Sequence, residues 1–506
     1  MPFNEDNLKF ILGFKLKNLR LQRGYSLKDV ATRANMSISY LSEIEKGKKY
    51  PKAEKLLALA NCYEVGYDEL VTVDGQDNLN PLAESLESGF FQEFPFQLFG
   101  LQAADLFSLL TTSPDKAGAL IRTFLEIGQM YDVRVEHFLF AALRAYQKMH
   151  NNYFEDLELA AESFLESDIW GGKPVNEINL RRYLEVNGRY IIDETLLADH
   201  PTLHSFRSVF IPGKRPRLFL NKRLLPSQKA FIFGKEIGTR LLGIETRATT
   251  SSWIKVESFE QVLNNYRTSY FAGALLIGRT KVVGGLSQLF NQKTWDPVGF
   301  LGLMKSLDST PEMFFYRIGQ LAHNYFGLSS HYFMRLAKRD SEDFIDVSKM
   351  LNLSTIPLPR GFSNSENYCR KWAGMKLLAD RTWERGIAFP DLPARSGPTA
   401  QAQRSNFANT GQEVFSFAVS RAMQLSPSDD SAVILGFPMD DALKSVIRFW
   451  DDPALKDQLV GITCERCNWG PKECSERMAD PSLANEMRDV EVYERALSEL
   501  QTRYQS

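Results

Sequence analysis

Residues 16–60 read LKNLRLQRGYSLKDVATRANMSISYLSEIEKGKKYPKAEKLLALA, and this stretch decides the fold of the N-terminal part of the chain. Its apolar residues recur at spacings of three and four, the period of an amphipathic helix. Ser26 and Ser37 stand where hydroxyl side chains cap two short helices, while Gly24 breaks the first run and Gly47 suits the end of the third. Two short helices joined by a tight turn form a helix-turn-helix unit. We therefore expect a bundle of short helices over residues 1–72.

The charge of the chain is unevenly distributed. Its 506 residues are 44% hydrophobic and 24% charged, proportions typical of globular domains, and the formal net charge is -2. Between residues 9 and 55, however, twelve Lys or Arg stand against four Asp or Glu. The overall charge excludes a chain that binds polyanions along its whole length, whereas the N-terminal module is basic enough to do so.

The start of the chain, MPFNEDNLKF, is polar and lacks the apolar segment of a secretory signal. No apolar run approaches the roughly 18–20 residues that span a bilayer. We therefore expect a cytoplasmic protein without a membrane partner. In that compartment the five cysteines are not expected to form structural disulfides.

The basic module has the pattern of a known DNA-binding family. The stretch quoted above resembles the XRE, or Cro/repressor-like, family over its full length, which implies a lambda-repressor-like bundle whose third helix lies in the major groove of double-stranded DNA. The resemblance implies a dimer on a palindromic operator. It departs from the family at Leu27, where a phosphate-contacting glutamine is frequent.

The same resemblance assigns the DNA contacts to the third helix and the residues after it. Glu43 has acceptors for a cytosine amino group, and Ile38 can contact a thymine methyl. The lysines would hold phosphates, which gives affinity and salt dependence without sequence reading. The expected DNA-binding residues are Ser37, Ile38, Ser39, Tyr40, Ser42, Glu43, Lys46, Lys48 and Lys49.

Composition and periodicity divide the rest of the chain. TVDGQDNLNPL, residues 72–82, is rich in turn-forming residues and marks a boundary. We expect a linker and helical region over 73–168, a central domain over 169–345 and a C-terminal domain over 346–506. The helices of the second region either carry the dimer contact or brace the central domain. The fold class is mainly α, with an α+β central domain and an α+β C-terminal domain that contains cysteines.

The stretch GKEIGTRLL, residues 234–242, has the layout of a zinc-protease helix without its histidines. In HExxH, histidines four apart hold zinc and the glutamate activates the bound water. Here Lys235 and Thr239 replace the histidines, and Glu236 remains. Two β-like runs precede this helix in RSVFIPGKRPRLFLNKRLL, residues 207–225. The order resembles the ImmA/IrrE-type metallopeptidase-like domain, which implies a peptidase shape kept as a scaffold or a ligand-sensing fold, with no catalytic residues.

A cysteine cluster stands near the C-terminus, in GITCERCNWGPKECSERMADP. Cys464, Cys467 and Cys474 are spaced C-x2-C-x6-C, and thiolates suit zinc or an iron–sulfur cluster. Cys369, in ENYCRKW, is the candidate for a fourth ligand. Cys62 occupies an apolar helix position and is expected in the core. Zinc, iron–sulfur and unliganded thiols remain alternatives.

Taken over nearly its whole length, the chain resembles the short-chain fatty acyl transcriptional regulators. The resemblance rests on the XRE domain, the ImmA/IrrE-like middle, YCRKW and the cysteine segment. It implies a dimeric transcription factor that senses an acyl-CoA and binds a metal through cysteines. The sequence departs from the family around Cys369, where a glycine-rich run ending in Cys-Pro would be expected.

Two features bear on the effector. An acyl-CoA needs cations for its phosphates, and the hairpin region offers them, although solvated surface charge explains the same residues; they are Lys214, Arg215, Arg217, Lys222 and Arg223. The segment FPDLPARSGPTAQAQRSNFANTGQ, residues 389–412, has the composition of a mobile loop or insertion.

We therefore expect a DNA-binding transcriptional regulator without enzymatic activity, responsive to an acyl-CoA-type metabolite, a cysteine-bound metal or cluster, or both. One alternative is a metalloprotease-type regulator that cleaves a partner repressor. Another is an autoregulated component of a defence or toxin–antitoxin system.

Overall fold

A computed structural model describes residues 5–71, residue 98 and residues 135–504, apart from gaps at 251–255, 257, 339–344, 357, 359–365, 380–397, 409, 424, 426–428 and 470–471. The chain divides into two compact units, Met1–Tyr146 and Gln147–Ser506. The expected linker, residues 72–82, and most of the expected helical region lie outside the described residues. The rest of that region contains helices α10 (Val135–Met149) and α11 (Glu155–Glu166), in agreement with its 3.6-residue period.

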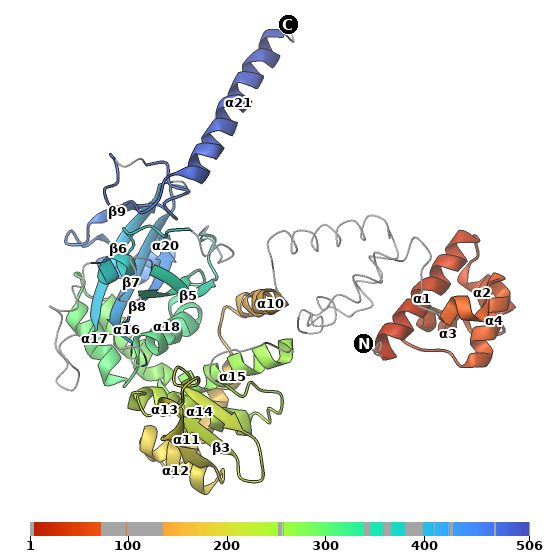
Figure 1. Ribbon diagram of the computed structural model, residues 1–506, viewed down its shortest axis with the longest axis horizontal. Helices are drawn as coiled ribbons and strands as arrows, with labels where there is room; N and C mark the ends of the chain where they lie inside the picture. The colour runs from red at the N-terminus through yellow and green to blue at the C-terminus, as the bar shows by residue number, and fades with distance from the viewer. Residues whose placement is uncertain are drawn as a thin grey trace. The chain divides into compact units, whose positions relative to one another are not determined.

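The N-terminal unit contains the expected bundle of short helices (Figure 1). They are α1 (Glu5–Gln22), α2 (Leu27–Arg33), α3 (Ile38–Glu45), α4 (Ala53–Tyr63) and α5 (Tyr67–Val71). Leu16, Leu41 and Ile44 are completely buried in one core to which all five helices contribute. Cys62 is partly buried against this core, as its apolar position predicts.

Local signals set the ends of these helices where the sequence places them. Ser26 Oγ accepts from Asp29 N at 3.2 Å and Asp29 Oδ2 accepts from Ser26 N at 2.8 Å, so α2 begins with a capping box. Ser37 Oγ accepts from Tyr40 N at 3.1 Å and caps α3. Gly47, at φ 68°, ends α3, because Lys48 N bonds to Glu43 O at 2.9 Å in a turn that favours glycine.

A buried ion pair fixes α1 against α3. Arg20 donates from Nε to Glu45 Oε1 at 2.7 Å and from Nη2 to Glu45 Oε2 at 2.9 Å. The two side chains are 11% and 5% exposed. Close approach of the two helices also depends on Gly13, since a Cβ there would lie 2.4 Å from Ile44 O. The position of the turn-and-helix pair α2–α3 relative to α1 thus rests on a charge pair and a glycine.

The second unit begins with helices around a small sheet. The helices are α11, α12 (Glu177–Val186), α13 (Leu196–Asp199), α14 (Pro226–Leu241) and α15 (Phe259–Leu276), and the strands are β1 (Ile191–Asp193), β2 (Ser208–Ile211) and β3 (Arg217–Leu220). The strand order is β1-β3-β2, with β1 parallel and β2 antiparallel to β3. The predicted hairpin is confirmed, and α14 carries the degenerate motif directly after it.

A six-stranded sheet forms the rest of the unit, in the order β5-β4-β8-β7-β6-β9 (Figure 1). Its strands are β4 (Tyr332–Lys338), β5 (Ile345–Asn352), β6 (Thr399–Phe407), β7 (Glu413–Ala422), β8 (Asp430–Pro438) and β9 (Asp457–Val460). One face packs on α16 (Arg279–Phe290), α17 (Pro297–Ser306) and α18 (Pro311–Phe326) through residues such as Phe315 and Phe417. The other face packs on α19 (Ala373–Ala379). The remaining elements are α20 (Asp441–Val446), a 3-10 turn η3 (Arg448–Asp451) and α21 (Ser482–Tyr504).

The large sheet changes two expectations. The boundary expected between residues 345 and 346 falls inside β5, and β4 lies before it, so hydrogen-bonded strands join the parts that we separated there. Within the expected loop 389–412, Thr399–Phe407 is strand β6, which pairs with β7 and β9; residues 389–397 lie outside the described residues. Its small and polar residues are typical of loops, but Ala402, Gln403 and Ser405 are buried in the sheet.

In the part of the chain that the structure describes, no helix combines the length and the apolarity that a bilayer crossing requires.

Replacing Arg20 with alanine should loosen the N-terminal bundle, because the buried Glu45 carboxylate would lose its partner. The loss of one partner of a buried pair costs about 3 kcal/mol. Hydrogen exchange of the full chain should therefore speed up by roughly two orders of magnitude for amides of α1 and α3. Lys28→Ala on the exposed side of α2 is the control; equal exchange in both variants would contradict the role of the pair.

Candidate functional site

The residues expected to contact DNA form one exposed face of the N-terminal unit. Ser37, Ile38 and Ser39 at the start of α3 are exposed, with Ile38 at 48% of its full surface. Tyr40, Ser42 and Glu43 are half-buried, and Lys46, Lys48 and Lys49 are exposed after the helix. An exposed isoleucine at the first turn of a capped helix contributes nothing to the core, so it is available to a base edge.

Glu43 and Lys49 contact each other on this face. Lys49 Nζ lies 2.8 Å from Glu43 Oε2, and this hydrogen bond lowers the pKa of Glu43 and raises the pKa of Lys49. An exposed pair of this kind contributes little to stability. A nucleic acid can therefore separate it, which frees the carboxylate for a base and the ammonium for a phosphate.

Leu27, the position of the departure from the family, packs partly buried against the bundle core. A leucine side chain has no hydrogen-bond donor, so it cannot replace the glutamine as a phosphate contact.

The glutamate of the degenerate protease motif is engaged by other side chains. Arg247 donates from Nη1 and Nη2 to the two carboxylate oxygens of Glu236, both at 2.6 Å, and Tyr190 Oη donates to Oε2 at 3.0 Å. Glu236 is 4% exposed. Burial opposes the charge of Arg247, yet its hydrogen bonds to Glu236 raise the pKa of the guanidinium overall. A carboxylate held by three donors is poorly placed to take a proton from water.

The other two positions of the motif have structural partners. Lys235 Nζ donates to Asn265 Oδ1 at 2.7 Å, and Thr239 Oγ1 donates to the carbonyl of Lys235 at 2.8 Å. Burial lowers the pKa of Lys235 to about 8. The flanking Gly234 and Gly238 let α15 approach, since a Cβ at Gly238 would lie 2.7 Å from Phe271. The spacing of GKEIG therefore serves helix packing.

Three of the four expected metal-binding cysteines are brought together. Cys369 N donates to Ile462 O at 3.1 Å and Cys464 N donates to Asn367 O at 2.7 Å, so segments about a hundred residues apart run side by side. Cys369, Cys464 and Cys467 are buried, and all five cysteines are free thiols. Burial, together with the neighbouring Cys464 and Cys467, raises the pKa of Cys369 to about 11.

The donor types suit zinc or an iron–sulfur cluster, but the arrangement does not complete a site. Cys474 is a half-buried free thiol. Among the described residues, no group of three or more His, Cys, Asp or Glu side chains is arranged to hold a metal ion. The buried cluster thus consists of the thiols of Cys369, Cys464 and Cys467.

The cations of the hairpin region lie at the surface. Lys222 pairs with Asp199 at 2.8 Å, and all five are exposed: Lys214, Arg215, Arg217, Lys222 and Arg223.

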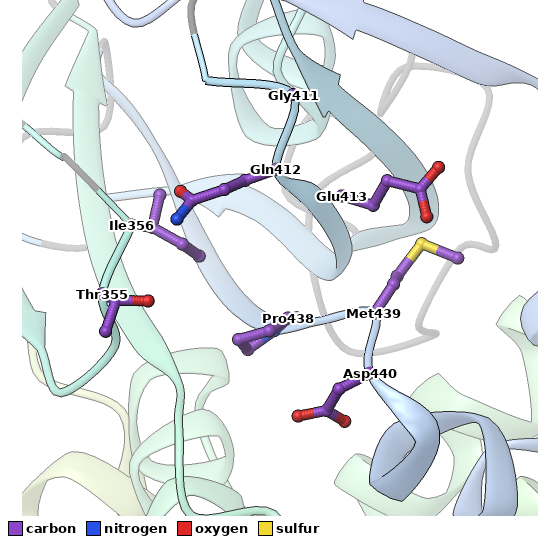
Figure 2. A pocket seen from close by; sticks show the side chains of 8 residues that line it. All are labelled: Thr355, Ile356, Gly411, Gln412, Glu413, Pro438, Met439 and Asp440. Carbon is purple, nitrogen blue, oxygen red and sulfur yellow. The ribbon is translucent and has the colours of Figure 1, made fainter.

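A cavity of about 350 Å³ opens at one end of the large sheet (Figure 2). It is lined by Thr355, Ile356, Gly411, Gln412, Glu413, Pro438, Met439 and Asp440. None of these eight residues is basic, and Asp440 already caps α20 by accepting from Leu443 N at 2.9 Å. The cavity is therefore unsuited to the phosphates of an acyl-CoA.

A group of cations near the start of α18 was not predicted from the sequence. Arg207, Arg335 and Arg421 surround the carboxylate of Glu312, although they come from a loop and two strands. No local motif marks these positions, because 214 residues separate the first arginine from the last.

Comparison with known proteins bears out the N-terminal prediction. Residues 16–70 match the helix-turn-helix family HTH_3. The HTH-type transcriptional regulator DdrOP3 of Deinococcus deserti is 40% identical over 57 residues, 11% of this chain and 44% of that protein. The propionyl-CoA carboxylase regulator of Cereibacter sphaeroides is 29% identical over 123 residues, 24% of each chain.

A solved Mycobacterium tuberculosis transcriptional regulator aligns with 68% of this chain and 93% of its own, at 19% identity and a TM-score of 0.44. The chain spans less than half the length of the two curated relatives. What these comparisons establish is a helix-turn-helix domain at residues 16–70.

Alkylation should distinguish the buried thiols from Cys474. At pH 8 a thiol with a pKa of about 11 is almost fully protonated, and the protonated form does not react with iodoacetamide. We expect Cys369 to react at least about tenfold more slowly than Cys474, as measured by mass spectrometry of peptides. Protein unfolded in urea is the control, since all five thiols should then react at similar rates.

Proposed function

We propose that the chain is a DNA-binding transcriptional regulator whose α3 enters the major groove. The observation that carries the proposal is the exposed face of Ser37, Ile38 and Ser39 beside three exposed lysines. The polar side chains and the isoleucine would read base edges, and the lysines would hold phosphates on either side. DNA binding of this kind is compatible with the cytoplasmic location that we expect for the chain.

A dimer is part of the proposal. One helix-turn-helix domain buries a small surface on DNA, and two copies related by a twofold axis would read a palindromic operator with much greater specificity. Sedimentation of the full chain, alone and with duplex DNA, tests this element independently.

Control by a small acyl-CoA-type metabolite is supported by the similarity to a relative named as a propionyl-CoA carboxylase regulator. A cysteine-bound zinc or iron–sulfur cluster is supported only by the three gathered thiols, and the ligand set would have to rearrange to close around a metal. Elemental analysis and an absorption spectrum of protein purified without oxygen test this part.

We also propose that the chain does not hydrolyse peptides. Support comes from the engagement of Glu236 by Arg247 and Tyr190 and from the absence of both histidines from the motif on α14. Peptide cleavage that is lost in Glu236→Gln would favour the metalloprotease-type regulator instead.

Replacing Lys46 and Lys48 with glutamate should weaken DNA binding and its salt dependence together. Each lost phosphate contact reduces the slope of log K against log salt by about one, so the double variant should lose about two. At low salt we expect affinity for duplex DNA to fall at least roughly tenfold. Fluorescence anisotropy with a labelled duplex over a salt series measures both quantities.

The matched control is Lys214→Glu, which makes the same charge change at an exposed turn of the second unit. It should bind DNA as the unaltered protein does. Equal binding by the Lys46/Lys48 variant and the unaltered protein would remove the proposed interface.

A further inference from the structure

The last helix, α21, is anchored to the second unit near its start. Ala484 N donates to Glu465 O at 3.0 Å, and among the residues of α21 whose burial the structure describes, Ala484 alone is buried. From Asn485 to Glu499 every residue so described is exposed. Most of the stability of a protein helix comes from packing against a neighbour, and the described part of this unit supplies little of it to α21.

The exposed apolar residues of α21 form a stripe along one side of the helix. Val490, Tyr493 and Leu497 are 54%, 72% and 57% exposed, and their spacings of three and four place them on one face. The sequence continues these alternating spacings in both directions, with Glu486 as the one polar exception; the apolar positions are Leu483, Val490, Tyr493, Leu497, Leu500 and Tyr504. Such a repeat over roughly three heptads is the pattern of a coiled coil.

The charges of α21 favour a second copy of the same helix as its partner. Residues 482–494 contain four acidic residues and one arginine, whereas residues 495–504 contain two arginines and one glutamate. Two copies that run in opposite directions place the acidic half of each beside the basic half of the other. Parallel copies would place the two acidic halves side by side, which is destabilising. The helix dipoles favour the antiparallel arrangement as well.

We propose that α21 pairs with α21 of a second copy of the chain as an antiparallel two-helix coiled coil. At 1.5 Å per residue, its 23 residues span about 35 Å, enough for several layers of apolar contact. A twofold axis presents the same stripe on both copies, so each copy covers the apolar residues that the other exposes. The inference names the contact surface of the proposed dimer; it rests on that part of the proposed function and not on DNA binding.

Two valines of α21 provide a matched pair of variants. Val490 and Val492 are equally exposed, at 54%, but residues two apart on a helix face different directions, so Val490 lies on the stripe and Val492 does not. Val490→Asp would bury an unpaired carboxylate of each copy in the coiled coil, and the dissociation constant of the dimer should rise at least about tenfold. Val492→Asp makes the same change of residue and should leave the constant within about twofold.

Sedimentation of the full chain over a concentration series, in the absence of DNA, measures both variants. A chain that stays monomeric, or equal association of Val490→Asp and Val492→Asp, would overturn the inference. A dimer that persists in Val490→Asp would leave the proposed dimer intact and assign it to another surface. Because DNA is absent from this measurement, a failure of the chain to bind DNA would contradict the proposed function and leave this inference standing.

The direction of pairing has its own test. Replacing Arg495 and Arg503 with glutamate would set acidic residues against acidic residues in an antiparallel pair, so the dimer should weaken severalfold at low salt and less at high salt. In a parallel pair the same change would exchange one pairing of like charges for another and leave the affinity nearly unaltered. Equal association of this double variant and the unaltered chain at low salt would therefore overturn the antiparallel arrangement.

Discussion

The structure depends on one constraint: a carboxylate that is taken out of water needs a cation held against it. Three buried glutamates meet this requirement in the same way, each receiving two hydrogen bonds from a single arginine on another segment of the chain; the pairs are Glu45 with Arg20, Glu158 with Arg317 and Glu236 with Arg247. Each pair joins separate elements, so the charges position helices as well as neutralise one another. Removing one partner of such a pair is strongly destabilising, because the other charge is left buried without a partner. Replacing both partners with apolar residues of similar size costs little or nothing. Such pairs therefore matter more for the positions of the segments they join than for overall stability.

The same constraint explains the surroundings of Glu236 on α14. The sequence shows that Lys235 and Thr239 stand where a zinc-protease helix has histidines, but it does not show which residue is the partner of Glu236. Arg247 lies eleven residues further on and reaches back beneath the Phe210 ring, 3.8 Å from its centre, to take both carboxylate oxygens. Glu236 is thus held in a largely buried ion pair. The spacing of this stretch also serves helix packing, because Gly234 and Gly238 let α15 approach α14.

Sequence reasoning succeeded where short-range chemistry decides the structure. The caps at Ser26 and Ser37 and the turn at Gly47 act within four residues, so the bundle and its exposed face could be predicted. It failed where long-range pairing decides. Strand β6 consists largely of small and polar residues, which do not indicate a strand by themselves. Its extended conformation is stabilised by backbone pairing with β7 and β9. The proximity of Cys369 to Cys464 was expected from ligand chemistry, whereas the cations around Glu312 carry no local pattern at all.

Glu312 departs from the one-arginine rule, because arginines from two strands share its carboxylate. Arg421 on β7 donates to it at 2.8 Å, and Arg335 Nε on β4 lies 3.3 Å from it. These strands flank β8 on the sheet face that α18 covers. Without the carboxylate, two cations of like sign would face α18 with no partner there, which is costly for partly buried groups. One acidic residue in the first turn of α18 thus holds that helix to two strands of the sheet.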